Sequence, residues 1–283
     1  MDVRSIGVVG TGTMGQGIAT VMAVAGFEVV VRSRNEASAG AVLAAITKYV
    51  DRQADKGKLT ADERDATLAR VRCTDAFADL ADCDLVIESI IEDRRAKAEV
   101  FAELDAVCAE HTILASNTST FPITELAVAT RRPGRVCGMH FFNPAPVMAL
   151  VEVASTLVCD DETVATAVAV AERCGKRVIL VEDMAGFVVN QILFGYFASA
   201  LRLANASSTS VADIDAAMRG ACNFPMGPFE LMDLIGIDVT MAVFDALYEE
   251  YREPQFACPP LLRRMVSADH LGRKSGRGFY DHR

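Results

Sequence analysis

Short apolar segments alternate with longer segments of helical periodicity over the first two thirds of the chain. Ser5–Val9 is a continuous apolar run followed at once by glycines, which is typical of a fully buried strand. Residues 13–25 have helical spacing, and residues 27–32 (FEVVVR) predict a second strand. The alternation continues with strands near 70–73, 84–89, 113–116, 136–142, 150–153 and 177–182, and with helices near 37–56, 60–70, 94–109 and 160–174. This order predicts a mostly parallel sheet covered by helices on both faces.

The pattern changes after Asp183, where strand signals stop. Helical patterns cover about 185–205, 211–221, 228–251 and 259–268. We therefore expect an α/β domain over residues 1–184, with a helical arm at about 37–70, followed by a smaller all-helical domain over 185–283. The arm would contain two helices, the second capped by Thr60-Ala-Asp-Glu63.

Composition and charge narrow the class of protein. The chain has 283 residues, of which 51% are hydrophobic, with a formal net charge of −10. This acidic balance argues against a nucleic-acid partner, because binding phosphate backbones needs a basic face. No apolar run approaches the roughly 18–20 residues of a membrane span, and no signal segment precedes the first strand. The eight cysteines lack metal-ligand spacing. We expect reduced thiols, no metal and a cytoplasmic protein.

A glycine motif follows the first strand. Gly10, Gly12 and Gly15 fit GxGxxG between a strand and a helix, with Thr13 and Met14 opening the helix. The glycines allow a tight turn, close approach of a pyrophosphate and close helix–strand packing, while the helix N-terminus attracts phosphate. In this context the motif predicts a Rossmann-type dinucleotide site, although a glycine-rich turn is the alternative.

The end of the second predicted strand bears on the choice of cofactor. An NAD site usually has a carboxylate there to accept a hydrogen bond from the ribose 2′-hydroxyl. This chain has Ser33 at that point, flanked by Arg32 and Arg34. A hydroxyl and guanidinium groups suit a 2′-phosphate, whereas a carboxylate repels it. We therefore expect NADP(H) to be preferred, with NAD(H) as the second choice; solvated surface arginines are the alternative explanation.

Several polar segments follow predicted strands, where ligands of such sheets bind. They are Ser116-Asn-Thr-Ser119, His140-Phe-Phe-Asn143-Pro-Ala-Pro146, Leu150-Val-Glu152-Val and Gly186-Phe-Val-Val-Asn190. Each is ambiguous alone: a histidine beside two phenylalanines is more often structural, and Ser119 or Asn190 also suits a cap or turn.

Together with the glycine motif, these segments resemble the L-3-hydroxyacyl-CoA dehydrogenase family, in particular its short stand-alone 3-hydroxybutyryl-CoA dehydrogenases. The resemblance runs over essentially the whole chain. It also includes Cys83-Asp-Leu-Val-Ile-Glu88, Pro225-Met-Gly-Pro-Phe-Glu230 and Leu271-Gly-Arg-Lys-Ser-Gly-Arg-Gly-Phe-Tyr280.

The resemblance implies an oxidoreductase that interconverts 3-hydroxyacyl and 3-oxoacyl thioesters of coenzyme A. His140 would be the general acid and base, a role that suits imidazole because its unperturbed pKa lies near neutral pH. Glu152 would orient the imidazole and stabilise the imidazolium. Ser119 and Asn190 would hold the reacting oxygen of the substrate.

The resemblance also implies further contacts and a homodimer formed through the helical domain. Glu92, Lys97, Asn143 and Lys274 match positions used around the cofactor. The helical arm resembles the family's pantetheine-binding arm, in which Arg52, Lys56 and Lys58 would meet phosphates of coenzyme A; basic residues on an exposed helix are more often simply solvated.

Three hypotheses are compatible with these residues to different degrees. The first is a short-chain (S)-3-hydroxyacyl-CoA dehydrogenase. The second has the same chemistry on an acyl-carrier protein, from which the sequence separates it poorly. The third, a catalytically inactive dinucleotide sensor, predicts a lesion in the catalytic set, and that set is intact.

Overall fold

The computed structural model describes residues 1–283 and divides into two compact units. The first comprises Met1–Thr118 and Pro122–Asp183, and the second comprises Ser119–Phe121 and Met184–Arg283. The chain therefore leaves the first unit twice, because the three residues 119–121 group with the helical part. The sequence pattern does not indicate this short excursion.

The first unit is built on one eight-stranded sheet with the order β3-β2-β1-β4-β5-β6-β7-β8. All neighbours are parallel except β6 and β7, which are antiparallel. Residues 142–149 connect these two strands, which is too short for the dozen or more residues of a parallel crossover. The strands are β1 (Ser5–Val9), β2 (Glu28–Arg32), β3 (Val71–Thr74), β4 (Leu85–Glu88), β5 (Ile113–Ser116), β6 (Val136–Phe141), β7 (Leu150–Ser155) and β8 (Arg177–Glu182).

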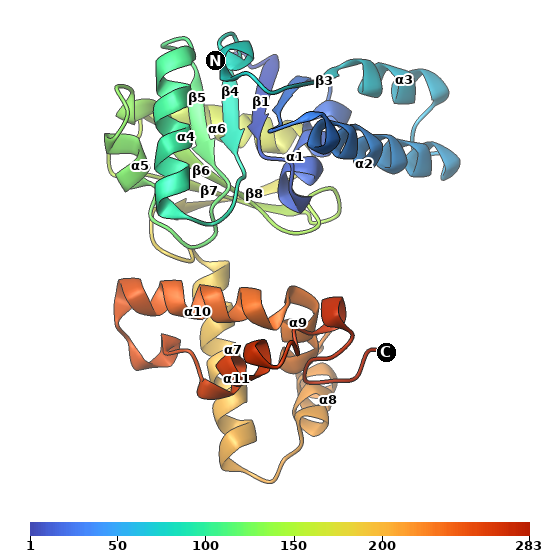
Figure 1. Ribbon diagram of the computed structural model, residues 1–283, viewed down its shortest axis with the longest axis vertical. Helices are drawn as coiled ribbons and strands as arrows, with labels where there is room; N and C mark the ends of the chain where they lie inside the picture. Colours follow the sequence, from blue (N-terminus) through green and yellow to red (C-terminus); the bar gives the residue numbers. More distant parts are fainter. The chain divides into compact units, whose positions relative to one another are not determined.

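Helices cover both faces of this sheet. In Figure 1, α4 lies in front of the strands and α6 behind them. The helices of this unit are α1 (Thr13–Val24), α2 (Glu36–Asp55), α3 (Ala61–Ala69), α4 (Arg94–Val107), α5 (Thr124–Val128) and α6 (Asp161–Arg173), with short 3-10 turns η1 (Phe77–Leu80) and η2 (Pro133–Arg135). Central strands have no exposed face, so the continuous apolar run that begins the chain is buried from Ile6 to Val9.

The helical arm is formed by α2 and α3, which Figure 1 shows extending away from the sheet. Val42, Ile46 and Val50, spaced by four residues, give α2 a single buried stripe. Asn35 and Thr60 cap the two helices, and the Thr60 side chain forms the expected capping box with Glu63.

The second unit is helical. It contains α7 (Val189–Ala206), α8 (Val211–Cys222), α9 (Pro228–Ile235), α10 (Ile237–Tyr251) and α11 (Pro260–Ser267), with 3-10 turns η3 (Pro254–Phe256) and η4 (Arg273–Ser275). The sequence pattern suggests one helix over 228–251, but Gly236 adopts a φ of 105° and separates α9 from α10. A φ in this range is open to glycine and ends the first helix.

Two buried carboxylates organise the second unit. Asp215 accepts hydrogen bonds from the backbone N–H groups of Phe229 and Glu230 at 2.9 and 3.0 Å, at the N-terminus of α9. It also accepts one from the Tyr280 hydroxyl at 2.7 Å. Asp233 accepts from the N–H groups of Phe279 and Tyr280. Both aspartates therefore hold the C-terminal segment against α8 and α9.

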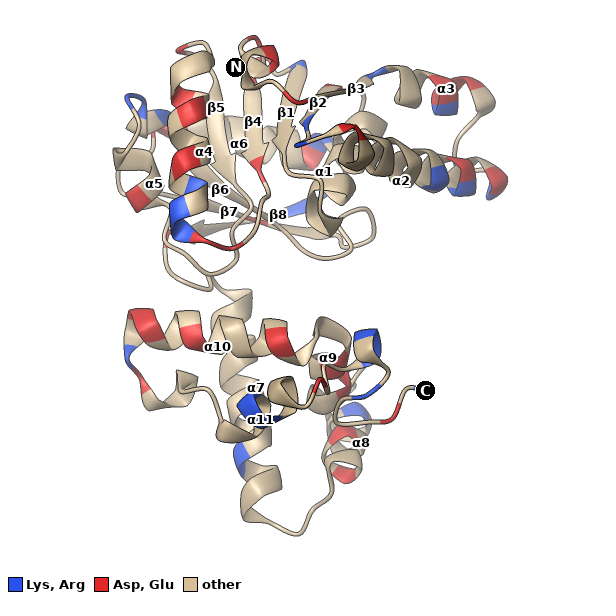
Figure 2. Cartoon of the chain, viewed as in Figure 1, with Lys and Arg blue, Asp and Glu red and all other residues tan.

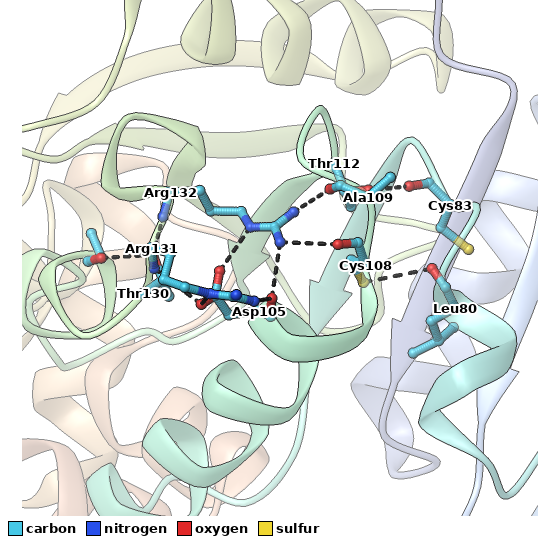
Figure 3. Close-up of polar contacts among 10 residues, drawn as sticks. Leu80, Cys83, Asp105, Cys108, Ala109, Thr112, Thr130, Arg131 and Arg132 are labelled. Atoms are coloured by element: carbon cyan, nitrogen blue, oxygen red, sulfur yellow. Dashed lines mark hydrogen bonds and ion pairs between the residues drawn. The ribbon is translucent and has the colours of Figure 1, made fainter.

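A third buried carboxylate, Asp105, closes the C-terminal end of α4 in the first unit (Figure 3). Its oxygens accept hydrogen bonds from Arg131 Nε at 2.9 Å and Arg132 Nε at 2.8 Å. Arg132 also donates to the carbonyl oxygens of Asp105, Cys108 and Ala109. The guanidinium thus binds carbonyls near the helix end that the helix itself leaves unsatisfied.

All eight cysteines are unpaired thiols, and no group of three acidic, histidine or cysteine side chains is placed to hold a metal ion. None of the helices combines the length and the hydropathy that spanning a bilayer requires.

Candidate active site

The antiparallel pairing of β6 and β7 brings His140 and Glu152 together. The two residues are direct partners in the strand register, so their side chains lie on the same face of the sheet. His140 Nδ1 lies 2.6 Å from Glu152 Oε2. The Glu152 side chain is fully buried and that of His140 is 8% exposed. The strand register thus brings together the two residues that the family resemblance implies as partners.

This hydrogen bond determines what the imidazole can do. A carboxylate only accepts, so Nδ1 carries the proton and Nε2 is the basic nitrogen. The Phe142 ring packs against the imidazole with a centroid separation of 4.4 Å. A buried carboxylate at this distance can stabilise a positively charged imidazole, as in other His–carboxylate pairs.

Ser119 and Asn190 meet in the second unit. Asn190 lies in the first turn of α7 and its Nδ2 donates a hydrogen bond to the Ser119 carbonyl oxygen at 3.2 Å. The turn before this helix is tight, because Gly186 and Phe187 both have positive φ. The positive φ of Gly186 favours glycine there, and a Cβ at this position would lie 2.6 Å from a Leu247 methyl group, so that side chain would have to move.

The glycine motif forms the tight loop between β1 and α1. A Cβ on Gly10 would lie 2.2 Å from the Ser89 carbonyl oxygen, and one on Gly15 would lie 2.1 Å from the Gly10 carbonyl oxygen. A Cβ on Gly12 would meet no protein atom within 4 Å, so the backbone there borders open space at the start of α1. This is the arrangement that a pyrophosphate needs at a helix N-terminus. Thr13 and Met14 form the first turn of that helix.

The residues at the end of β2 differ in what their side chains contact. Arg32 stacks its guanidinium over the Phe77 ring at 4.3 Å. Ser33 is 2% exposed, and its hydroxyl donates to the carbonyl oxygens of Asn35 and Thr74 at 3.2 and 3.3 Å. The Ser33 proton is therefore already used within the protein. Arg34 is exposed at the surface of the loop.

Lys97 and Glu92 lie in a buried polar cluster whose centre is Glu88. Lys97 Nζ is 2.8 Å from Glu88 Oε1 and 3.1 Å from Glu92 Oε2. The side chains of Glu88 and Lys97 are 0% and 2% exposed, whereas that of Glu92 is 36% exposed. Sequence reasoning gave no role to Glu88; the signal that was available is a charged residue ending an otherwise fully apolar strand.

Asn117 is a second residue that sequence reasoning missed. It follows β5, and its Oδ1 accepts a hydrogen bond from the Phe141 N–H at 2.8 Å, while its Nδ2 donates to Ser89 Oγ at 3.3 Å. The Asn117 side chain therefore connects the carboxyl ends of β4 and β6. Its partner Phe141 directly follows His140 in the chain.

The remaining predicted contacts lie at the surface. Asn143 is exposed in the loop after β6 and precedes a cis proline. Lys274 in η4 forms an ion pair with Asp238, with Nζ 2.6 Å from Oδ2. Arg52 and Lys56 are exposed near the end of α2. Acidic residues alternate with them, so Figure 2 shows both charges along the arm and not a uniformly basic face.

Comparison with known proteins places this geometry in a family. Residues 5–184 match the 3-hydroxyacyl-CoA dehydrogenase NAD binding domain, and residues 186–282 match the 3-hydroxyacyl-CoA dehydrogenase C-terminal domain. The chain is 46% identical over 280 residues to a 3-hydroxybutyryl-CoA dehydrogenase of Mycobacterium tuberculosis, covering 98% of each chain. It is 42% identical over 282 residues to a probable 3-hydroxybutyryl-CoA dehydrogenase of Bacillus subtilis, covering 100% of this chain and 98% of the other.

A solved structure shows the same likeness. The (S)-3-hydroxybutyryl-CoA dehydrogenase of Ralstonia eutropha superposes with a TM-score of 0.96 at 40% identity, over 100% of both chains. The two family profiles together span residues 5–184 and 186–282, and the relative from Mycobacterium tuberculosis is 46% identical over 98% of each chain. The chain therefore belongs to the 3-hydroxyacyl-CoA dehydrogenase family.

Proposed function

We propose that this protein interconverts (S)-3-hydroxyacyl-CoA and 3-oxoacyl-CoA of short chain length, with 3-hydroxybutyryl-CoA and acetoacetyl-CoA as substrates. The buried His140–Glu152 pair, with 2.6 Å between Nδ1 and Oε2, is the observation that carries the proposal. The names of the relatives from Mycobacterium tuberculosis and Bacillus subtilis support the same substrate.

The residues of the pair divide the acid–base work. His140 Nε2 takes the proton of the 3-hydroxyl during oxidation and returns it to the forming alkoxide during reduction. Glu152 holds Nδ1 and stabilises the positive charge while the imidazole is protonated. The bound nicotinamide supplies the chemistry of hydride acceptance and donation at C3. Ser119 and Asn190, which the family resemblance assigns to the reacting oxygen, bind that oxygen by hydrogen bonds.

The cofactor that we propose is NADP(H) in preference to NAD(H). The end of β2 lacks a carboxylate, and Arg34 is an exposed cation at that point. Because the Ser33 hydroxyl donates to two carbonyl oxygens, we assign the main phosphate contact to Arg34. One charge-assisted contact is worth about 1.5–3 kcal/mol. That energy corresponds to a preference of roughly tenfold to hundredfold.

Wild-type protein is therefore expected to reduce acetoacetyl-CoA, with a higher kcat/KM for NADPH than for NADH. Initial rates of nicotinamide oxidation, measured with each cofactor in turn, test both parts. Folded protein that oxidises neither cofactor contradicts the reaction, and a higher kcat/KM with NADH contradicts the cofactor preference alone. The double substitution Ser33→Asp with Arg34→Ile is expected to reverse the preference.

The carrier of the acyl group is tested in the same assay. We propose coenzyme A, with Arg52 and Lys56 of the arm near its phosphates. Faster turnover of the acetoacetyl thioester of an acyl-carrier protein than of acetoacetyl-CoA would instead favour the biosynthetic alternative.

We also propose that the protein is a homodimer formed through the second unit. Phe194, Phe197 and Leu201 of α7 are buried in that unit's own core, but Ile192 is 70% exposed and Leu203 is 50% exposed. Exposed apolar side chains on one helix suit a protein interface. Light scattering at micromolar concentration is expected to give about twice the chain mass of 30.4 kDa. A monomer under these conditions contradicts the proposal, and Ile192→Glu is expected to shift the mass toward the monomer.

A further inference from the structure

Five side chains of the first unit form a closed ring of ion pairs and hydrogen bonds, here called the Glu88 ring. Its members are Glu88 at the end of β4, Glu92, Lys97 on α4, Ser116 at the end of β5 and Thr118. Lys97 Nζ binds Glu88 at 2.8 and 3.0 Å, and Glu92 at 3.1 Å. Ser116 Oγ donates to Glu88 Oε2 at 2.6 Å and accepts from the Thr118 N–H at 3.2 Å. The Thr118 hydroxyl donates to Glu92 and closes the ring.

Glu88 is the central acceptor of the ring. Its carboxylate is 0% exposed and receives four contacts, from Lys97 twice, from Ser116 and from the Ile90 N–H at 2.7 Å. Each carboxylate oxygen receives two of these contacts, which together hold the carboxylate in its observed orientation. A buried ion pair is seldom more stabilising than apolar residues of the same size. Stability alone therefore gives no reason for this arrangement.

Two members of the ring connect it to the proposed chemistry. Glu92 has a side chain that is 36% exposed, and it matches a cofactor position of the family. Thr118 has its N–H bound by Ser116, and it is followed in the chain by Ser119. The ring also lies beside the glycine loop, because a Cβ on Gly10 would lie 2.2 Å from the carbonyl oxygen of Ser89, the residue directly after Glu88.

We infer that Glu88 is a positioning residue for the reaction, acting through the ring on Glu92 and on the Ser116–Ser119 segment. The negative charge of Glu88 neutralises the Lys97 ammonium, so the ion pair between Lys97 and Glu92 is weaker than it would be if Glu88 were absent. Glu92 then accepts hydrogen bonds from hydroxyl groups of the dinucleotide, and the Thr118 peptide keeps Ser119 in place for the substrate oxygen. This inference rests on the proposed function.

The test uses Glu88→Gln, which keeps the size of the side chain but replaces one acceptor with an NH₂ donor. That donor faces either Lys97 or Ser116, both of which already donate, so the ring opens. The dissociation constant of NADPH and NADH, measured by nicotinamide fluorescence on folded protein, is expected to rise about tenfold, and kcat to fall. Glu99→Gln is the matched control, because Glu99 lies on α4, the helix that carries Lys97, and its exposed side chain pairs only with the exposed Arg95 in the structure's ion pairs.

Ser116→Ala separates positioning from general loss of stability. It removes the link between Glu88 and the Thr118 peptide but leaves the Glu88–Lys97–Glu92 ion pairs in place. The dinucleotide dissociation constant is expected to stay within twofold of wild type, while kcat falls about tenfold. If the substitution only lowered the stability of the fold, the dissociation constant and kcat of the folded protein would both stay as in wild type.

Each outcome decides the inference. Folded Glu88→Gln that binds both dinucleotides within twofold of wild type overturns it. If Glu88→Gln does not fold, the Ser116→Ala variant decides, and an unchanged kcat in that variant overturns the inference. Wild-type protein that binds neither dinucleotide overturns the proposed function as well, so the two failures are distinguishable.

Discussion

Replacing His140 with alanine is expected to lower kcat by ~10²–10⁴-fold, the usual contribution of a general acid or base. In the proposed mechanism the imidazole acts on the substrate hydroxyl and not on the dinucleotide. The dissociation constant of the reduced cofactor is therefore expected to remain within about threefold of wild type. Steady-state reduction of acetoacetyl-CoA, together with fluorescence titration of the cofactor, measures both quantities. A variant with kcat within threefold of wild type would remove His140 from the mechanism.

Glu152→Gln is the matched companion of this experiment. Glutamine keeps a hydrogen-bond acceptor 2.6 Å from Nδ1 in the native geometry but removes the negative charge. The imidazolium is then less stabilised, so kcat is expected to fall and its pH dependence to change. The same pH–rate profile as wild type would assign Glu152 a purely structural role.

The largest effect on stability is expected for Asp105→Ala. The substitution removes the carboxylate that pairs with Arg132 (Figure 3). The Arg132 side chain is only 9% exposed. Breaking a buried pair by removing one partner typically costs ~3–5 kcal/mol, because the remaining charge is buried without compensation. Arg132 keeps its carbonyl partners at Cys108 and Ala109, which places the expected loss near ~3 kcal/mol. Urea unfolding followed by circular dichroism measures the free energy of unfolding.

The pH dependence of this effect has a defined sign. Burial raises the pKa of Asp105, but hydrogen bonds from Arg131 and Arg132 outweigh it and hold the pKa below the ordinary value. The carboxylate therefore stabilises the protein above the unfolded pKa of about 3.9, and this contribution is lost as pH falls through the folded pKa. The difference between wild type and variant is expected to shrink below about pH 4. A pH-independent difference contradicts the assignment.

The exposed pair formed by Arg64 and Asp65 provides the control for Asp105. The side chain of Asp65 is 70% exposed, so Asp65→Ala is expected to change the free energy of unfolding by no more than about 1 kcal/mol. If Asp105→Ala lowers the free energy of unfolding by no more than Asp65→Ala does, the buried Asp105–Arg132 pair does not stabilise the fold more than an exposed pair.

The sequence by itself determined the features that depend on local residue patterns. Apolar runs and helical spacing placed the strands and the arm within a few residues, because burial on both faces of a strand or along one stripe of a helix produces a periodic pattern. In the second unit they also indicated helices, but they joined α9 and α10 into one helix over 228–251. The glycine motif was predictable because its spacing is a local pattern, although the atom that a Cβ on Gly10 would meet, the Ser89 carbonyl oxygen, is distant in the sequence. The NADP preference was predicted from the residues at the end of β2 and stays a prediction.

Only the tertiary structure decided which distant side chains meet. His140 and Glu152 face each other because β6 and β7 pair antiparallel in one register, and a shift of one residue would turn the two side chains to opposite faces. Glu88, Lys97 and Ser116 converge because parallel strands end at the same edge of the sheet, which no spacing along the chain records. The Ser33 hydroxyl is held by the Thr74 carbonyl oxygen, 41 residues away. Local energetics select the elements, whereas strand pairing and packing select the contacts, and the chemistry of this site depends on the contacts.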